Sequence, residues 1–282
     1  MARSGTYIYK ESTSMNKTTR WLLILAIAAG AGAAVFFLSH NEAPEQQAAA
    51  PKPETPAPTD EALARHPVPE AGAAAGGAEP AKPLPPLKDS DAALLESLGQ
   101  LFEPNRLGEL FIQKDMINRL VVTIDNLPRA KLPQRDVPTL PPPGKFLVNS
   151  QTAGGAVIAP ENYARYAGYV QFFADMDTRK IVSLYFHFYP LFQEAYNNLG
   201  YKSAYFNDRL VAAIDDLLAA PEIKDPVELV QPSVFYKFAD PRLEALSSGQ
   251  KIMLRIGGDN AAKVKVKLRE LRQALTNPDV NK

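Results

Sequence analysis

The chain has 282 residues, with 31 basic and 31 acidic side chains, so its formal net charge is zero. No net positive field draws such a chain toward nucleic acid, and nucleic acid is not expected as a partner. The chain contains no cysteine, which excludes disulfides, thiolate nucleophiles and cysteine-held iron–sulfur or zinc sites.

An uncharged apolar stretch lies near the start of the chain, at residues 21–38 (WLLILAIAAGAGAAVFFL). As a helix it would be about 27 Å long, close to the ~30 Å hydrocarbon thickness of a bilayer, and it therefore predicts a transmembrane helix. Basic residues precede this stretch, and none follows it before Lys52. The positive-inside rule places residues 1–20 in the cytoplasm as a short tail and the rest of the chain beyond the membrane.

A cleaved signal peptide is the alternative interpretation of this stretch. Its apolar core usually has ~7–15 residues and is followed by small residues at the cleavage site. The run here is longer and ends in Phe-Phe-Leu, which favours an uncleaved anchor. The string MNKTTRWLLIL from Met15 is typical of a protein's start, so Met1 and Met15 both stay open as the first residue.

Small residues recur on one face of the predicted anchor, where Ala26, Gly30 and Ala34 are spaced four apart. Such a face lets two helix backbones approach closely in lipid. A structural homo-oligomer formed through this face is therefore one hypothesis for the function.

The composition changes at residues 39–88 to mostly Ala, Pro, Glu and Gly. This segment has too few large apolar side chains to offset the entropy lost on ordering, and it is predicted to be a disordered, partly polyproline linker. His40 and His66 lie there without neighbouring ligands, so no metal site is expected.

Residues 89–282 predict a single, mainly α domain with a few short strands. A helix is expected to begin within residues 89–91, where Asp and Ser are suitable N-caps. A second helix should begin at Pro104 and carry a broad apolar stripe to Leu127, which is typical of a central helix packed on more than one side.

Prolines interrupt residues 127–146 and predict a long loop there. The strings KFLVN and AVIA, which follow, are candidate short strands. Helices return at residues 161–174 and 178–199. In the second of these, His187 falls on the polar half, and Pro190 is expected to kink the helix or split it in two.

The last part predicts a helix in SAYFNDRLVAAIDDLLAAPE, strands at residues 227–230 and 234–238, and helix starts at Asp240 and Asp259. In AAKVKVKLRELRQAL the alternation of Lys and Val first suggests a strand. However, its apolar positions at 264, 268, 271 and 275 share one helical face, which predicts a helix.

Basic side chains surround that apolar face of the last helix. They are Lys263, Lys265, Lys267, Arg269 and Arg272. Such a patch could bind an anionic wall polymer, a lipid headgroup or an acidic partner. A plain solvated face is the alternative.

No catalytic site, cofactor or metal is expected, because the sequence shows none of the residue sets that those chemistries need. The carboxylates of Glu161, Asp175 and Asp177 keep open an unrecognised enzyme that acts on cell-wall material. Pairs of acids such as Asp175 and Asp177 lack further ligands for a metal.

Four strings together resemble the proteobacterial proteins grouped as domain of unknown function 3014: FYPLFQEAYNNLGY, FNDRLVAAIDDLLAAPE, VQPSVFYKFADPRLEALSSGQKIMLRIG and AAKVKVKLRELRQAL. The resemblance covers residues 91–276. It implies an anchor in a bacterial inner membrane, followed by a Pro/Ala-rich spacer and a mostly helical domain. That domain would then lie in the periplasm. It supplies no catalytic residues.

The expected protein is thus a single-pass inner-membrane protein, whose domain at residues 89–282 lies in the periplasm. We expect that domain to be a non-catalytic binding module, with another envelope protein or the cell wall as its partner.

Overall fold

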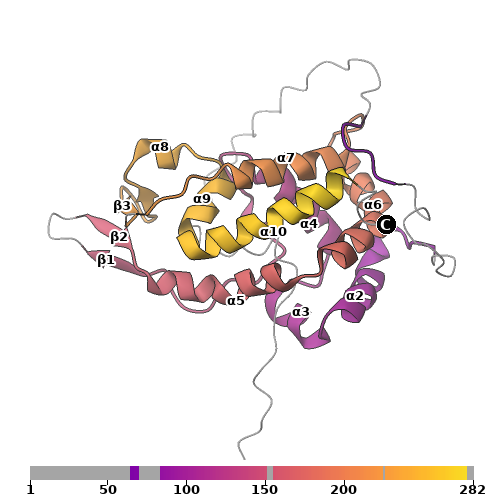
Figure 1. Cartoon of the computed structure of the whole chain (residues 1–282), viewed down its shortest axis with the longest axis horizontal. Coiled ribbons are helices and arrows are strands. Elements are labelled where there is room, and N and C mark those ends of the chain that lie inside the picture. The colour runs from indigo at the N-terminus through magenta and orange to yellow at the C-terminus, as the bar shows by residue number, and fades with distance from the viewer. Residues whose placement is uncertain (1–63, 70–82, 151–154, 225, 278–282) are drawn as a thin grey trace, which may run out of the picture.

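The computed structural model describes residues 64–69, 83–150, 155–224 and 226–277 (Figure 1). Within these ranges, no helix is both long and apolar enough to cross a membrane. The predicted anchor at residues 21–38 lies outside the described residues, and so does its small-residue face of Ala26, Gly30 and Ala34.

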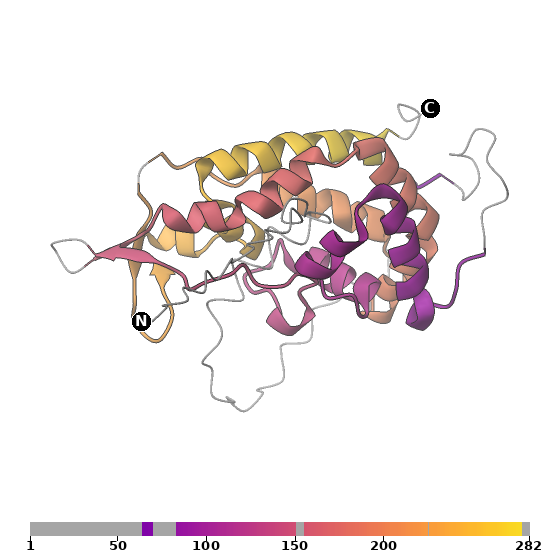
Figure 2. The same ribbon diagram turned by 90° about the horizontal axis from the view of Figure 1, so that it is seen from below.

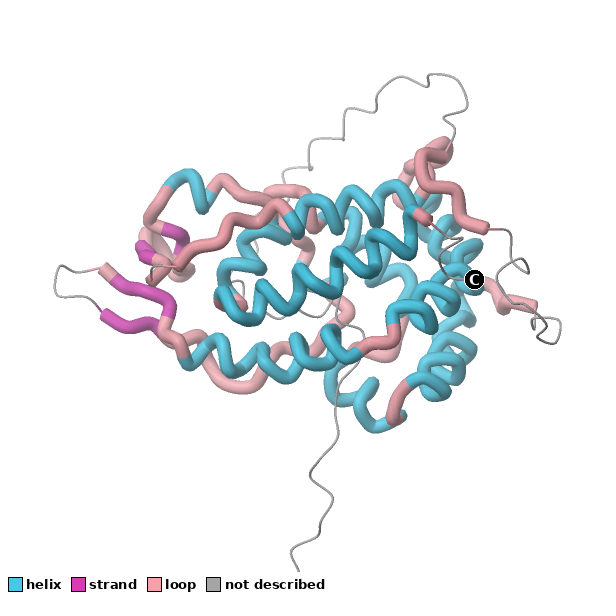
Figure 3. Tube along the Cα trace, viewed as in Figure 1, coloured by secondary structure: helices cyan, strands magenta, loops and turns pink. Residues whose placement is uncertain are grey.

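Helices dominate the described part of the chain, and the strands are short (Figure 3), which confirms the mainly α fold class. The α-helices are α2 (Ser90–Leu101), α3 (Pro104–Leu110), α4 (Met116–Asn126), α5 (Glu161–Asp175), α6 (Thr178–Asn198), α7 (Phe206–Leu218), α8 (Pro241–Glu244), α9 (Ser248–Arg255) and α10 (Gly258–Thr276). Two 3₁₀ turns are η1 (Leu87–Asp89) and η2 (Gln134–Asp136), and the strands are β1 (Val148–Ser150), β2 (Ala156–Ile158), β3 (Glu228–Val230) and β4 (Lys237–Phe238).

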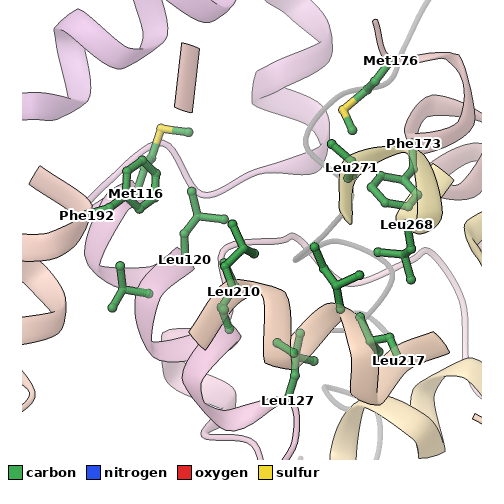
Figure 4. Close-up of a cluster of buried hydrophobic side chains, with 14 of the residues drawn as sticks. Met116, Leu120, Leu127, Phe173, Met176, Phe192, Leu210, Leu217, Leu268 and Leu271 are labelled. Atoms are coloured by element: carbon green, nitrogen blue, oxygen red, sulfur yellow. The ribbon is translucent and has the colours of Figure 1, made fainter. Parts of the chain in front are cut away.

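One large apolar core joins most of the helices. Helix α10 packs against α5, α6, α7 and α9, while α4 packs against α2, α6 and α7. The yellow α10 runs along one side of the molecule in Figure 2, with α5 next to it. In the core, Leu120 of α4 and Leu210 of α7 point toward each other, and Phe173 of α5 lies with Leu268 and Leu271 of α10 (Figure 4).

The four strands form one antiparallel sheet in the order β1-β2-β3-β4, at the end of the molecule where α5 begins (Figure 1). Val148 lies opposite Ile158, and Leu229 lies opposite Phe238. A second, smaller apolar cluster covers this sheet, and its buried members are Ile158, Val227, Leu229, Phe238 and Leu254.

Several local predictions are confirmed. The Lys-Val alternation near residue 265 is indeed part of a helix, α10. The four predicted short strands also form, although β1 begins later than predicted and β4 is reduced to Lys237–Phe238. Of the two outcomes predicted at Pro190, a kink or a split of the helix, the split does not occur, because α6 continues through this residue. Pro190 is exposed and lacks the N–H group that would donate to the carbonyl of Phe186.

The predicted single helix from Pro104 to Leu127 is broken into α3 and α4. The Pro-rich loop draws the intervening residues out of the helix, since the N–H of Ile112 donates to the Pro138 carbonyl and the N–H of Leu140 donates to the Leu110 carbonyl. Asp115 adopts a left-handed backbone with φ 58°. Helix α4 then begins with N–H groups that donate to the carboxylate of Asp91, which caps α4 rather than its own helix.

The predicted linker at residues 39–88 also needs correction within its described part. Residues 64–69 lie against the beginning of α7 (the indigo stretch in Figure 1), where Val68 packs on the core. Leu87 begins η1 and belongs to the core. The folded domain therefore begins before residue 89 and includes a separate upstream segment.

Candidate functional site

A cleft of about 750 Å³ lies between the start of α5, residues 220–227 and the start of α10. We call it the α5/α10 cleft. Its walls combine apolar, basic and acidic side chains. Among them are Ile158, Tyr163, Ile223, Val227, Leu254, Lys224, Lys263, Lys265, Glu222 and Asp259.

Close contact between α10 and α5 sets the inner wall of this cleft. Gly257 has φ 88°, and a Cβ atom there would lie 2.6 Å from Cγ of Tyr163. The side-chain amide of Asn260 donates to the carbonyls of Tyr163 and Ile256, at 2.9 and 2.8 Å. Burial raises the pKa of the Tyr163 hydroxyl, so this side chain is a neutral wall of the cleft at physiological pH.

The start of α10 gives one end of the cleft a positive character. Gly257 is the N-cap and supplies no side-chain acceptor, so the N–H groups of the first turn have no partner within the helix. The exposed side chains of Lys224 and Lys263 line the same cleft. Glu222 and Asp259 offset part of this charge. The arrangement can hold a ligand with apolar surface and acidic groups.

The predicted basic patch on α10 does not exist as one surface. Lys265 and Lys267 are only 5 and 7 % exposed. The ammonium of Lys265 donates to the Ala220 carbonyl at the end of α7 (2.7 Å), and that of Lys267 donates to the Met176 carbonyl at the end of α5 (2.9 Å). Each cation therefore stabilises the carboxyl-terminal end of a neighbouring helix.

The remaining members of the patch are also separated from one another. Arg272 pairs with Asp215 of α7. Lys263 and Arg269 are exposed, but of these two only Lys263 lines the α5/α10 cleft. Six positions separate them on the helix, which turns them to different sides at ~100° per residue.

Lys267→Met is expected to destabilise the domain by about 1–3 kcal/mol, because methionine cannot donate to the Met176 carbonyl. Lys263→Met is the matched control on the same helix and should stay within about 0.5 kcal/mol of the wild type. Urea denaturation followed by circular dichroism measures both. Equal midpoints for the two variants would mean that the buried ammonium contributes nothing.

The three carboxylates considered for catalysis do not form one group. Glu161 and Asp175 lie at opposite ends of α5, about 21 Å apart along its axis at ~1.5 Å per residue. Asp177 caps α6, where its Oδ1 accepts the N–H groups of Arg179 and Lys180. Asp175 and Asp177 do share a smaller cleft of about 430 Å³ beside α2 and α3. Within the described ranges, no three His, Cys, Asp or Glu residues gather as metal ligands.

His187, the histidine within the predicted helical domain, is half-buried on α6 and stands edge-on to the ring of Phe188, with 5.0 Å between the ring centroids. It lines none of the clefts described above.

A charged cluster between α4 and α7 was not predicted from the sequence. Asp125 is 4 % exposed, and its carboxylate accepts from Arg129 at 2.8 Å and from Arg209 at 2.9 Å. The hydroxyl of Tyr201 contacts both Arg129 and Asp125. Burial lowers the pKa of Arg129, but the combined effect of Asp125 and Tyr201 is larger and raises it. The cluster joins three segments and leaves no free carboxylate for chemistry.

A family model described as "Protein of unknown function (DUF3014)" matches residues 116–272, which is more than half of the chain. No curated protein and no solved structure matches this chain. The matched region begins with α4 and ends within α10, so it contains the α5/α10 cleft and the cluster around Asp125.

Proposed function

Because the chain belongs to this DUF3014 family, whose description supplies no activity, we propose a function from its architecture and its cleft. We propose a single-pass protein of the bacterial inner membrane, whose helical domain in the periplasm is a non-catalytic binding module. The apolar stretch at residues 21–38 and the basic residues before it support the location.

The α5/α10 cleft is the observation that carries the proposal of binding. A ligand in it would contact apolar walls, exposed lysines and the uncapped start of α10. These groups recognise an acidic segment of a protein or an acidic wall polymer without changing it covalently. The candidate catalytic carboxylates do not favour the enzyme alternative, since Glu161 and Asp175 lie too far apart for a glycosidase pair and Asp177 serves as a helix cap.

In-cell photo-crosslinking at the cleft tests this function. A photoreactive residue placed at Lys263 is expected to yield a crosslink to an envelope protein or to wall material, because this side chain lines the cleft. The same residue at Arg269, which is also exposed on α10 but lies outside the cleft, is the matched control. The control should yield at least about tenfold less product.

Equal crosslinking at positions 263 and 269, or none at either position together with no binding to isolated cell wall, would contradict the proposal. A product with twice the mass of the chain would favour the homo-oligomer instead.

A further inference from the structure

The described segment at residues 64–69 occupies a small site at the beginning of α7. The N–H groups of Arg65 and His66 donate to the two carboxylate oxygens of Asp208, at 3.0 and 2.8 Å. The side-chain amide of Asn207 donates to the His66 carbonyl at 2.9 Å. These bonds join residues more than 140 positions apart in the sequence, so the contact is tertiary.

The chemistry of the segment suits this site. Pro67 and Pro69 have no N–H group to donate. Arg65 and His66, which precede them, have adjacent N–H groups that one carboxylate can accept together. The backbone bends at Arg65 and His66, and the proline rings restrict the conformation of the residues before them, His66 and Val68. Val68 then packs against the main core. The site therefore contacts the backbone of the segment through hydrogen bonds and one small apolar side chain, Val68, through packing.

The domain side of the site is built into the core. Asn207 is fully buried, and its Oδ1 accepts from the hydroxyl of Tyr185 at 3.2 Å. Gln193 fixes the start of α7, because its Oε1 accepts the N–H of Phe206 and the hydroxyl of Tyr189. Burial, with a smaller effect of Asp208, raises the pKa of Tyr189 to about 12 and keeps it neutral. Side chains of α6 therefore hold the domain side of this site in position.

We propose that the beginning of α7 is a binding site for a proline-containing peptide, and that its occupant is residues 64–69 of the same chain. The bound segment then determines where the linker leaves the domain. It leaves 25 residues between the predicted anchor and residue 64, which reach at most about 80 Å at ~3.3 Å per residue. This limit on reach rests on the proposed membrane anchor, whereas the peptide site does not.

The absence of cysteine from the chain makes a direct test practical. We would introduce Val68→Cys or Arg65→Cys separately into the full-length protein and measure the rate of reaction with a thiol reagent. Cysteine is small and apolar enough to replace Val68 in its contact. The exposed Arg65 position retains its N–H bond and serves as the matched control.

The cysteine at position 68 is expected to react about tenfold more slowly than that at position 65. In the Asp208→Ala background the two rates should become equal within about twofold, because two hydrogen bonds to a charged acceptor are lost. Asp208→Asn retains only one accepting oxygen, so the ratio of the two rates should lie between those of the other two proteins. This second variant keeps the test valid if the alanine variant folds poorly.

Equal rates at positions 65 and 68 in the protein that retains Asp208 would overturn the site. A ratio of the two rates that neither Asp208 variant changes would overturn it as well. A ratio that falls on dilution would show that the segment comes from a second copy, and would overturn the intramolecular occupant. A charged reagent that labels position 65 only after cell lysis would contradict the periplasmic location while leaving the peptide site intact.

Discussion

Gly257→Ala is expected to lower the free energy of unfolding of the domain by about 3–5 kcal/mol, since two costs combine. The backbone at Gly257 has φ 88° and ψ 155°, a region that residues with a Cβ atom rarely adopt. The new methyl group would also lie 2.6 to 2.9 Å from three ring atoms of Tyr163. This loss is a large share of the total stability of an ordinary domain.

Gly258→Ala is the control for that prediction, because it adds the same methyl group one residue later. Its Cβ would lie 4.0 Å from the nearest atom, the Ile223 carbonyl oxygen, and its φ is not positive. Alanine is also the better helix former, so the change should be neutral or stabilise by up to about 1 kcal/mol. The measurement is circular dichroism in denaturant, because the single tryptophan, Trp21, lies outside the domain. Equal unfolding midpoints for the two variants would refute the tight contact.

Asp125→Ala is expected to destabilise the domain by about 3–5 kcal/mol, because it leaves two arginines beside the core without their shared acceptor. The carboxylate of Asp125 is buried and joins Arg129 to Arg209, which ties the end of α4 to α7. Its removal breaks both ion pairs and leaves Arg129 and Arg209, whose side chains are 39 and 23 % exposed, without this carboxylate. Urea denaturation at neutral pH measures the loss.

Asp215→Ala provides the matched comparison, since it breaks an Asp–Arg pair of similar geometry on the surface. The side chains of Asp215 and Arg272 are 46 and 42 % exposed, and an exposed pair of this kind contributes up to about 1 kcal/mol. A loss at Asp215 as large as that at Asp125 would mean that burial does not decide the strength of these pairs.

Part of the fold follows from local patterns in the sequence. Val264, Leu268 and Leu271 share one helical face, and this face identified α10 in spite of the Lys-Val alternation. Prolines after Leu127 correctly predicted a loop, and short β-rich strings correctly predicted β1 and β2. These features succeed because helix periodicity and proline chemistry depend on residues within a few positions of each other.

The α5/α10 cleft and the cluster around Asp125 could not be predicted in the same way. Asp125 stands near the end of α4, where a carboxylate opposes the helix dipole and would normally be expected in solvent. It is buried because Arg209, 84 positions away, reaches it. Likewise, Gly257 is close to Tyr163 only after α10 has packed on α5.

The sequence by itself determined the mainly α class, most helices and the presence of the short strands, because those depend on short-range periodicity and backbone chemistry. Only the tertiary structure decided that Lys265 and Lys267 are buried and that residues 64–69 bind at α7. The burial of a lysine or of a proline-rich segment depends on acceptors such as the Ala220 carbonyl and the Asp208 carboxylate. These acceptors lie about 45 to 140 positions away in the sequence, and only packing brings them close. A local sequence pattern therefore does not predict such contacts.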